Sequence, residues 1–169
     1  MIPSSGAFRV ELLNASHDRA SFSSDSEPLD RYLRTQVTQD VRRRVSTCYV
    51  LIEIHTTRLA GYYTLAAGGV PLNDLPPEIT KKLPRYPSVP VARVGRLVVG
   101  LACRGHKLGS ALIADAALRV LRYDMGVFAL AVDAKDEAAV AFYRHHGFVS
   151  LASAPDQRVL PLASFMGRS

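Results

Sequence analysis

The segment Pro90–Ser110, PVARVGRLVVGLACRGHKLGS, decides the fold of this chain. Its first half is rich in valine and leucine, which is typical of a buried strand. Its second half contains glycines and two cations, Arg104 and Lys107, and leads into a segment whose apolar residues recur with helical spacing. A loop between a strand and a helix N-terminus directs backbone N–H groups and positive dipole potential to one place. We therefore expect a phosphate-bearing cofactor at residues 104–110.

The whole chain has the size and composition of one compact domain. It has 169 residues, of which 48% are hydrophobic, and no repeat, linker or low-complexity tract divides it, so we expect a single domain over residues 1–169. Its apolar runs are too short to cross a bilayer, and its first six residues do not resemble a signal peptide. Two cysteines, Cys48 and Cys103, are too few for a disulfide framework. We expect a cytoplasmic protein with no membrane partner.

The chain is basic, with a net charge of +6 and a pI near 9.6. This balance suits a polyanionic partner or substrate, although many small basic proteins bind no nucleic acid. Single arginines usually lie on a solvated face, but a cluster predicts a basic patch. The clustered arginines are Arg31, Arg34, Arg42, Arg43 and Arg44. Arg93 and Arg96 alternate with apolar residues on the central strand, where a nucleic-acid contact and a strand-face salt bridge are equal alternatives.

Periodicity and turn residues predict alternating strands and helices. We expect strands at 8–13, 47–54, 58–67, 127–132, 148–151 and 159–162, besides the central strand that ends near Val99. Helices are expected from Glu27 through Val37, near 78–82, after Ser110 and at 136–145. Gly68-Gly69 is expected to end the third of these strands, and Gly147 to cap a helix in the left-handed conformation. The central strand–helix–strand unit requires parallel pairing, so the fold class is α/β with a mixed sheet.

The loop over residues 104–110 is moderately specific by itself. It lacks the spacing of a P-loop and of a dinucleotide-binding fingerprint. A basic turn that caps a helix explains these residues about as well as a cofactor does.

With the strand VGRLVV before this loop and FYRHHGF some forty residues after it, the chain resembles the Gcn5-related N-acetyltransferase (GNAT) superfamily. The family fingerprint, Q/R-x-x-G-x-G/A, binds the pyrophosphate of acetyl-CoA. Arg104 and Gly109 match its first and last fixed positions, and Lys107 stands at its middle glycine. Lysine suits that position if its φ is negative and its ammonium faces a phosphate. The resemblance implies acetyl-CoA as co-substrate, no metal, and a pyrophosphate site formed by Arg104, Gly105, His106, Lys107, Leu108, Gly109 and Ser110.

The resemblance extends from about Phe22 to Leu162. GYYTLAA, the connection beginning at Leu75, PVARVGRLVV and DEAAVAFYRHHGF occur in one order that is similar to the acetyltransferase toxins of bacterial toxin–antitoxin pairs. This implies a GNAT fold, with a central mixed sheet flanked by helices. It also implies that the acceptor is the α-amino group of an aminoacyl-tRNA, whose acetylation stops translation. The implied partner is a ribbon-helix-helix antitoxin, and a homodimer is common among such proteins.

The same resemblance implies the catalytic roles. Tyr143, in the FYxxxGF context, is expected to protonate the departing thiolate, since a phenol with a pKa near 10 is a competent donor. The alternative is an aromatic residue that packs beside Phe142 in the core. Backbone N–H groups of Leu97, Val98 and Val99 are expected to hold the thioester arm as an added strand. No general base is evident, but an α-amine with a pKa near 8 is partly neutral without one.

Other chemistries have weaker support. The five histidines show no metal-ligand spacing, Cys103 has no paired His or Asn signature of a nucleophile, and Asp115 is expected to face solvent. Two other functions remain open at this point. One is N-acetylation of a small-molecule or protein amine without a toxic role. The other is a non-catalytic module that binds CoA or nucleic acid.

Overall fold

The computed structural model describes residues 7–166, and these residues form two compact units. Unit 1 contains the residues up to Ala66 together with Gly95–Ala116, and unit 2 contains Ala67–Val94 together with the residues from Ala117 onward. The first six residues, on which the expectation about a signal peptide rests, lie outside the described part. Between residues 7 and 166, no helix is long and apolar enough to cross a membrane. The single domain over residues 1–169 stays a prediction.

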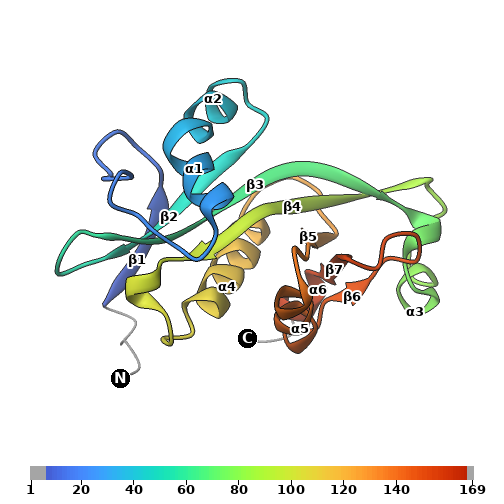
Figure 1. Cartoon of the computed structure of the whole chain (residues 1–169). Helices are drawn as coiled ribbons and strands as arrows, with labels where there is room; N and C mark the ends of the chain where they lie inside the picture. Colours follow the sequence, from blue (N-terminus) through green and yellow to red (C-terminus); the bar gives the residue numbers. More distant parts are fainter. Residues whose placement is uncertain (1–6, 167–169) are drawn as a thin grey trace. The chain divides into compact units, whose positions relative to one another are not determined.

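Unit 1 is built on four neighbouring strands (Figure 1). Strand β1 (Phe8–Leu12) pairs antiparallel with β2 (Thr47–Glu53), and β2 pairs antiparallel with the first part of β3 (Leu59–Pro71). The last part of β4 (Ser88–Val99) follows β3 in the strand order. Both long strands, β3 and β4, continue into unit 2.

Helices cover unit 1 because their apolar stripes meet this sheet. Helix α1 (Glu27–Thr35) begins at Ser26, whose side chain accepts a hydrogen bond from the Leu29 N–H. The expected single helix through Val37 is wrong. It is two helices, because Gln36 leaves the helical region with φ of −120° and α2 (Val37–Arg42) begins after it. Both helices bury residues in one core cluster, whose fully buried members include Leu33, Val37, Val50 and Tyr62.

Unit 2 contains the remaining strands in the order β3-β4-β5-β7-β6. Strand β5 (Ala129–Asp133) pairs with β4 in parallel, which confirms the expected parallel unit. Strand β7 (Gln157–Pro161) pairs antiparallel with both β5 and β6 (Val149–Ser150).

The helical elements of unit 2 are short. They are the 3-10 turn η1 (Leu72–Asp74), α3 (Pro77–Thr80), α5 (Glu137–His145) and α6 (Ala163–Met166). Asp136 caps α5 by accepting a hydrogen bond from the Ala139 N–H. Gly147 has a φ of +91°, which confirms the left-handed residue expected after α5.

Strand β3 does not end at Gly68-Gly69, contrary to expectation. It continues through both glycines to Pro71, and β4 begins at Ser88, earlier than expected. The short contact at this point is with a side chain: a Cβ added to Gly69 would lie 2.6 Å from the Ser88 Oγ, which can rotate away, and 3.6 Å from the Val89 carbonyl oxygen. The two glycines therefore do not terminate the strand.

A second close approach lies in unit 1, where β3 passes β4 at Gly61. A Cβ added to Gly61 would lie 2.7 Å from the Val98 carbonyl oxygen and 3.4 Å from the Val99 Cα. Both neighbours are backbone atoms, which cannot rotate away. Gly61 therefore sets the distance between β3 and the end of β4.

The variant Gly61→Ala tests this constraint. We expect the free energy of unfolding, measured by urea denaturation, to fall by about 1–3 kcal/mol because the strands must separate. Gly126→Ala is the matched control, since an added Cβ there meets nothing within 4 Å and its φ is outside the left-handed region. An equal effect of the two substitutions would show that β3 and β4 tolerate a methyl group between them.

Candidate functional site

The expected anion loop lies entirely in unit 1, between the end of β4 and α4 (Leu108–Leu121). The chain leaves β4 through the 3-10 turn η2 (Leu101–Cys103) and reverses at Gly105, whose φ is +85°. A Cβ added to Gly105 would meet nothing within 4 Å. The first turn of an α-helix of this length directs N–H groups without intrahelical acceptors at the space in front of it. These features fit an anionic group such as a pyrophosphate.

Lys107 differs from expectation in its backbone conformation. Its φ is +58°, so the condition of a negative φ is not met, and the loop keeps the conformation that glycine adopts most easily. From this position the Lys107 carbonyl accepts a hydrogen bond from the Ala111 N–H at 3.3 Å, at the start of α4. A left-handed residue with a side chain costs about 1–2 kcal/mol. The exposed ammonium group adds positive charge beside the helix N-terminus.

Arg104 lies at the start of this loop, with its guanidinium occupied by a carboxylate. It forms an ion pair with Asp25 at 2.7 Å, and both side chains are more than half exposed. The segment around Asp25 lies beside the chain that leads into the loop, because the Leu101 N–H donates a hydrogen bond to the Ser23 carbonyl at 2.9 Å. Sequence analysis did not identify Asp25, because no pattern in the residues around it indicates a contact with Arg104. A phosphate at Arg104 must compete with this carboxylate.

The expected thioester strand, Leu97–Val99, is the end of β4. The parallel pairing of β4 with β5 covers only Val91–Val94, so β4 continues for five residues beyond it. On the β3 side, the Arg96 N–H donates to the Thr64 Oγ1 at 3.1 Å. Residues 95–99 therefore have β3 as the neighbouring strand on one edge, and the pairing with β5 does not extend to them on the other edge. Backbone groups at such an edge suit a ligand that binds as an added strand.

Tyr143 lies on α5 in unit 2, where only 7% of it is exposed. Its ring makes edge contacts with Phe142 and Phe148, at centroid distances of 5.2 and 5.3 Å. Burial, with a smaller contribution from Asp133, raises the pKa of Tyr143 to about 12. The phenol therefore stays protonated at neutral pH. Packing beside Phe142 is real, and it is compatible with a hydroxyl that donates a proton.

The clustered arginines are brought together on the two helices of unit 1. Arg31 and Arg34 lie on α1, each within 3.7 Å of Glu27, and Arg34 also donates to the Phe22 carbonyl. Arg42 ends α2, while Arg43 and Arg44 follow it, and all three are exposed. All five clustered arginines thus lie on these helices or directly after them, and their role in nucleic-acid binding stays a prediction.

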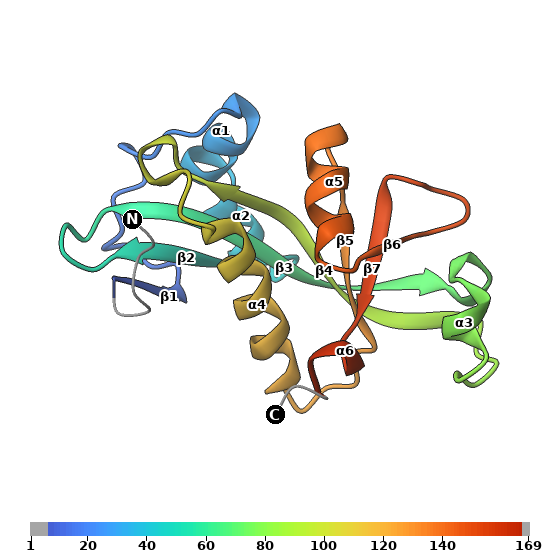
Figure 2. The ribbon, with the colours of Figure 1, turned by 90° about the horizontal axis from the view of Figure 1, so that it is seen from below.

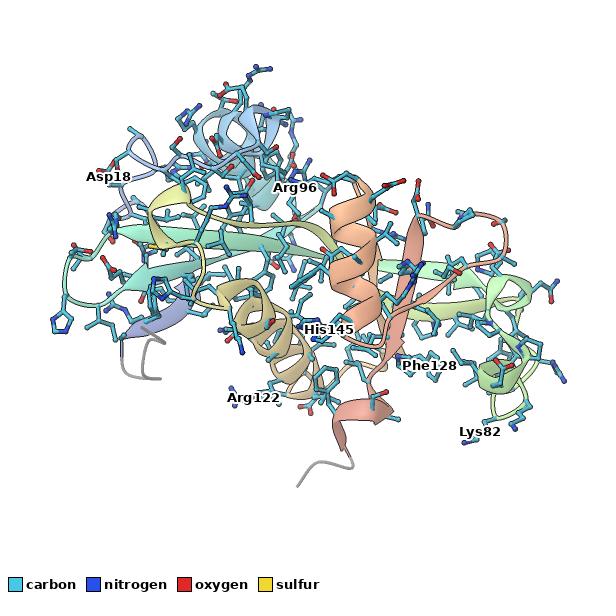
Figure 3. All side chains as sticks on the ribbon, turned by 60° about the horizontal axis from the view of Figure 1, so that its bottom comes forward. Asp18, Lys82, Arg96, Arg122, Phe128 and His145 are labelled. Atoms are coloured by element: carbon cyan, nitrogen blue, oxygen red, sulfur yellow. The ribbon has the colours of Figure 1, made fainter. Side chains whose placement is uncertain are left out.

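Arg93 and Arg96 lie on β4, and each has a different partner. Arg93 lies in unit 2, 3.7 Å from Asp133, which is the strand-face ion pair that the sequence left open. Arg96 lies in unit 1 with its guanidinium carbon 3.4 Å from the centre of the Tyr32 ring. The Tyr32 hydroxyl in turn donates to Asp40 at 2.7 Å. Arg96 therefore joins β4 to the helix pair, as Figure 3 shows.

Two further expectations concern single side chains. Asp115 does not face solvent freely, because it is half-buried and accepts a hydrogen bond from the Tyr63 hydroxyl at 2.5 Å. That contact joins α4 to β3, which no local pattern indicates. Cys103 is buried as expected, and burial raises the pKa of its thiol, so a reactive thiolate is disfavoured. Among residues 7–166, no three potential metal ligands cluster.

A groove of about 460 Å³ lies in unit 2 between α5 and β7. Its lining includes Glu137 and Asp156 together with Arg144 and Arg158. The Nε of Arg158 is buried and has no hydrogen-bond partner in the part of the chain that the structure describes. Two cations and two carboxylates balance one another, so this groove differs from the anion loop of unit 1.

Lys107 generates a prediction about stability. Lys107→Gly removes the side chain that disfavours a positive φ, whereas Lys107→Ala keeps a Cβ and removes the same charge. We expect the free energy of unfolding, measured by urea denaturation, to be about 1 kcal/mol higher for the glycine variant than for the alanine variant. If the alanine variant is equally stable, the left-handed conformation does not persist in solution.

The chain matches the Acetyltransferase (GNAT) family over residues 11–148. It is 34% identical over 146 residues to a tRNA-acetylating toxin of Mycobacterium tuberculosis, covering 85% of this chain and 86% of that protein. It is 25% identical over 157 residues to a probable toxin TacT of Sinorhizobium fredii, covering 88% and 87%.

Solved structures agree with this match. AtaT complexed with acetyl-methionyl-tRNAfMet has a TM-score of 0.88 at 27% identity, covering 95% of this chain and 98% of that chain. A tyrosine-to-phenylalanine mutant of KacT has a TM-score of 0.88 at 26% identity, covering 96% and 99%. The expected GNAT fold is confirmed. This chain belongs to the Acetyltransferase (GNAT) family, and it is an N-acetyltransferase that uses acetyl-CoA as its acetyl donor.

Proposed function

We propose that this protein is a toxin that acetylates the α-amino group of aminoacyl-tRNA and thereby blocks translation. The observation that carries the proposal is 34% identity, over 85% of the chain, to a protein named as a tRNA-acetylating toxin. The basic surface on α1 and α2 supports it, since a small amine needs no such surface. AtaT, which has the same fold, has been solved with acetyl-methionyl-tRNAfMet.

Acetyl-CoA supplies the activated acetyl group, and the loop of unit 1 is the proposed site of its pyrophosphate. Gly105 leaves open space, α4 directs its first N–H groups there, and Arg104 and Lys107 add charge. Residues His106, Leu108, Gly109 and Ser110 complete the loop. We propose that Leu97, Val98 and Val99 hold the pantetheine arm through their backbone. The crystal structure of AtaTR bound with AcCoA has a TM-score of 0.82 at 25% identity to this chain.

We propose Tyr143 as the general acid. The amine nitrogen forms a bond to the thioester carbonyl carbon as the carbon–sulfur bond breaks, and the electron pair leaves on sulfur. The Tyr143 hydroxyl donates its proton to that sulfur and is re-protonated from water, while the nitrogen loses a proton to solvent. A phenol with a pKa of about 12 is a weaker acid than an alkyl thiol. Its main contribution is therefore a hydrogen bond to the developing thiolate.

The partner proposal follows from the toxin assignment. We propose that a small ribbon-helix-helix antitoxin neutralises the protein, and that the protein acts in the cytoplasm, where charged tRNA occurs. A homodimer, common among the toxins that the chain resembles, is proposed on the same basis. These proposals rest on the sequence resemblance and on relatives named as toxins.

Incubation with labelled acetyl-CoA and charged bulk tRNA tests the function. We expect label on the amino acid at the 3′ end and none on deacylated tRNA, because the acceptor is the α-amine. Label on a polyamine or a peptide amine, with none on any charged tRNA, would replace the toxin assignment with the small-amine alternative. No transfer to any amine would favour the non-catalytic module.

The variant Tyr143→Phe tests the general acid. We expect kcat to fall by about 10²-fold, within the usual range for general acid catalysis, with an unchanged affinity for acetyl-CoA. Tyr123→Phe, at an exposed tyrosine of the same unit, is the control and is expected to keep full activity. Equal activity of Tyr143→Phe and the wild type would remove Tyr143 from the chemistry.

The pH dependence tests the protonation state of this phenol. The rate is expected to rise as the α-amine deprotonates near its pKa of about 8. Because burial raises the pKa of Tyr143 to about 12, no fall from loss of its proton is expected below about pH 10. A fall between about pH 8 and 9 in the wild type that Tyr143→Phe lacks would contradict a buried, protonated phenol.

A further inference from the structure

The connection between β3 and β4 in unit 2 carries a cluster that the proposed site does not use. It consists of Lys81, Lys82, Arg85 and Tyr86, which follow α3, and we refer to these four residues as the basic tip. All four side chains are exposed, and 69% of Tyr86 is open to solvent. Figure 3 shows Lys82 pointing away from the ribbon. A ring this exposed is available to stack on a partner.

The backbone beneath the basic tip is firmly held. The Leu72 N–H donates to the Pro87 carbonyl at 3.1 Å, which closes the connection at its base. Leu83 packs against a buried cluster that includes Val70 and Val89, and its N–H donates to the Thr80 carbonyl at 3.0 Å. The basic tip is therefore a fixed surface, and binding to it costs little ordering entropy.

The cations of the basic tip differ from the arginines that are held in ion pairs. Among the residues that the structure describes, no ion pair involves Lys81, Lys82 or Arg85, whereas Arg31, Arg34, Arg58, Arg93 and Arg104 all have acidic partners. Asp74, an acid of the same connection, accepts a hydrogen bond from the Ser153 hydroxyl at 2.6 Å. Three cations and one exposed ring thus lie within residues 81–86, and the exposed Glu78 precedes them on α3.

This combination matches the chemistry of RNA binding. Lysine and arginine side chains contact phosphates, and an exposed aromatic ring stacks on an unpaired base. An anionic membrane would also attract the cations, but α3 has only four residues and offers no apolar helix face. We propose that the basic tip binds the body of the tRNA substrate, with the three cations on phosphates and Tyr86 stacked on an unpaired nucleotide. This inference rests on the proposed function.

The position of the basic tip determines what it can affect. Figures 1 and 2 both show α3 apart from α5, the helix that carries Tyr143, within unit 2. A contact away from the reacting amine is made equally in the ground state and the transition state. It therefore lowers KM for charged tRNA and leaves kcat unchanged.

Two variants test the proposal: the triple variant Lys81→Ala, Lys82→Ala, Arg85→Ala, and the single variant Tyr86→Ala. For the triple variant we expect a higher KM for charged tRNA and a slope of log affinity against log salt that is smaller by about 2. For Tyr86→Ala we expect KM to rise about tenfold with the slope unchanged, and for Tyr86→Phe a KM close to that of the wild type. The KM for acetyl-CoA and kcat are expected to stay constant.

The controls separate this inference from the proposed function. Arg122→Ala removes an exposed cation at the end of α4 in the same unit, apart from Lys82 in Figure 3, and is expected to leave KM unchanged. Binding of deacylated bulk tRNA is measured in parallel, so the basic tip is tested even if the wild type acetylates no tRNA. Unchanged tRNA binding in both variants would overturn the proposal. So would loss of binding to phosphatidylserine vesicles with tRNA binding intact.

Discussion

The close approach of β3 to β4 is the constraint on which the rest of the structure depends. Both strands run through both units, and Gly61 allows their backbones to approach where a Cβ would collide with the Val98 carbonyl oxygen. Because β3 fixes one edge of β4, the other edge is shared: β5 pairs with Val91–Val94, and residues 95–99 continue beyond that pairing. The same strand thus contributes to the core in one part and, in another, forms the edge where we propose that the pantetheine arm binds.

The loop after β4 shows how a catalytic family tolerates a substitution at a conformational position. At the turn into α4, Lys107 takes the left-handed conformation although its side chain disfavours it. In exchange, an ammonium group stands beside a helix N-terminus where a pyrophosphate is proposed to bind. Asp25, paired with Arg104, ties the segment before α1 to this loop. A local energetic cost at a binding loop is common where function requires the geometry.

Charge pairing divides the basic residues into structural and available ones. Arg96 stacks on Tyr32 and Arg93 lies beside Asp133, so both contribute to packing of the sheet against its neighbours. The exposed Arg42–Arg44 segment and the basic tip have no ion-pair partner among the described residues. Net charge alone predicted a polyanionic partner, but only the pairing pattern indicates which cations remain for it.

The sequence by itself predicted the order of the main strands, the parallel βαβ unit, the loop between β4 and α4 and the left-handed Gly147, but not the division of the first helix into α1 and α2. These follow from local periodicity, turn residues and a family pattern, all of which lie within short stretches. Only the tertiary structure decided that β3 runs past Gly68 and Gly69, that Asp115 binds Tyr63, and that Asp25 meets Arg104. Each of these depends on residues brought together from distant parts of the chain, and no local pattern encodes which backbone or side chain will lie opposite.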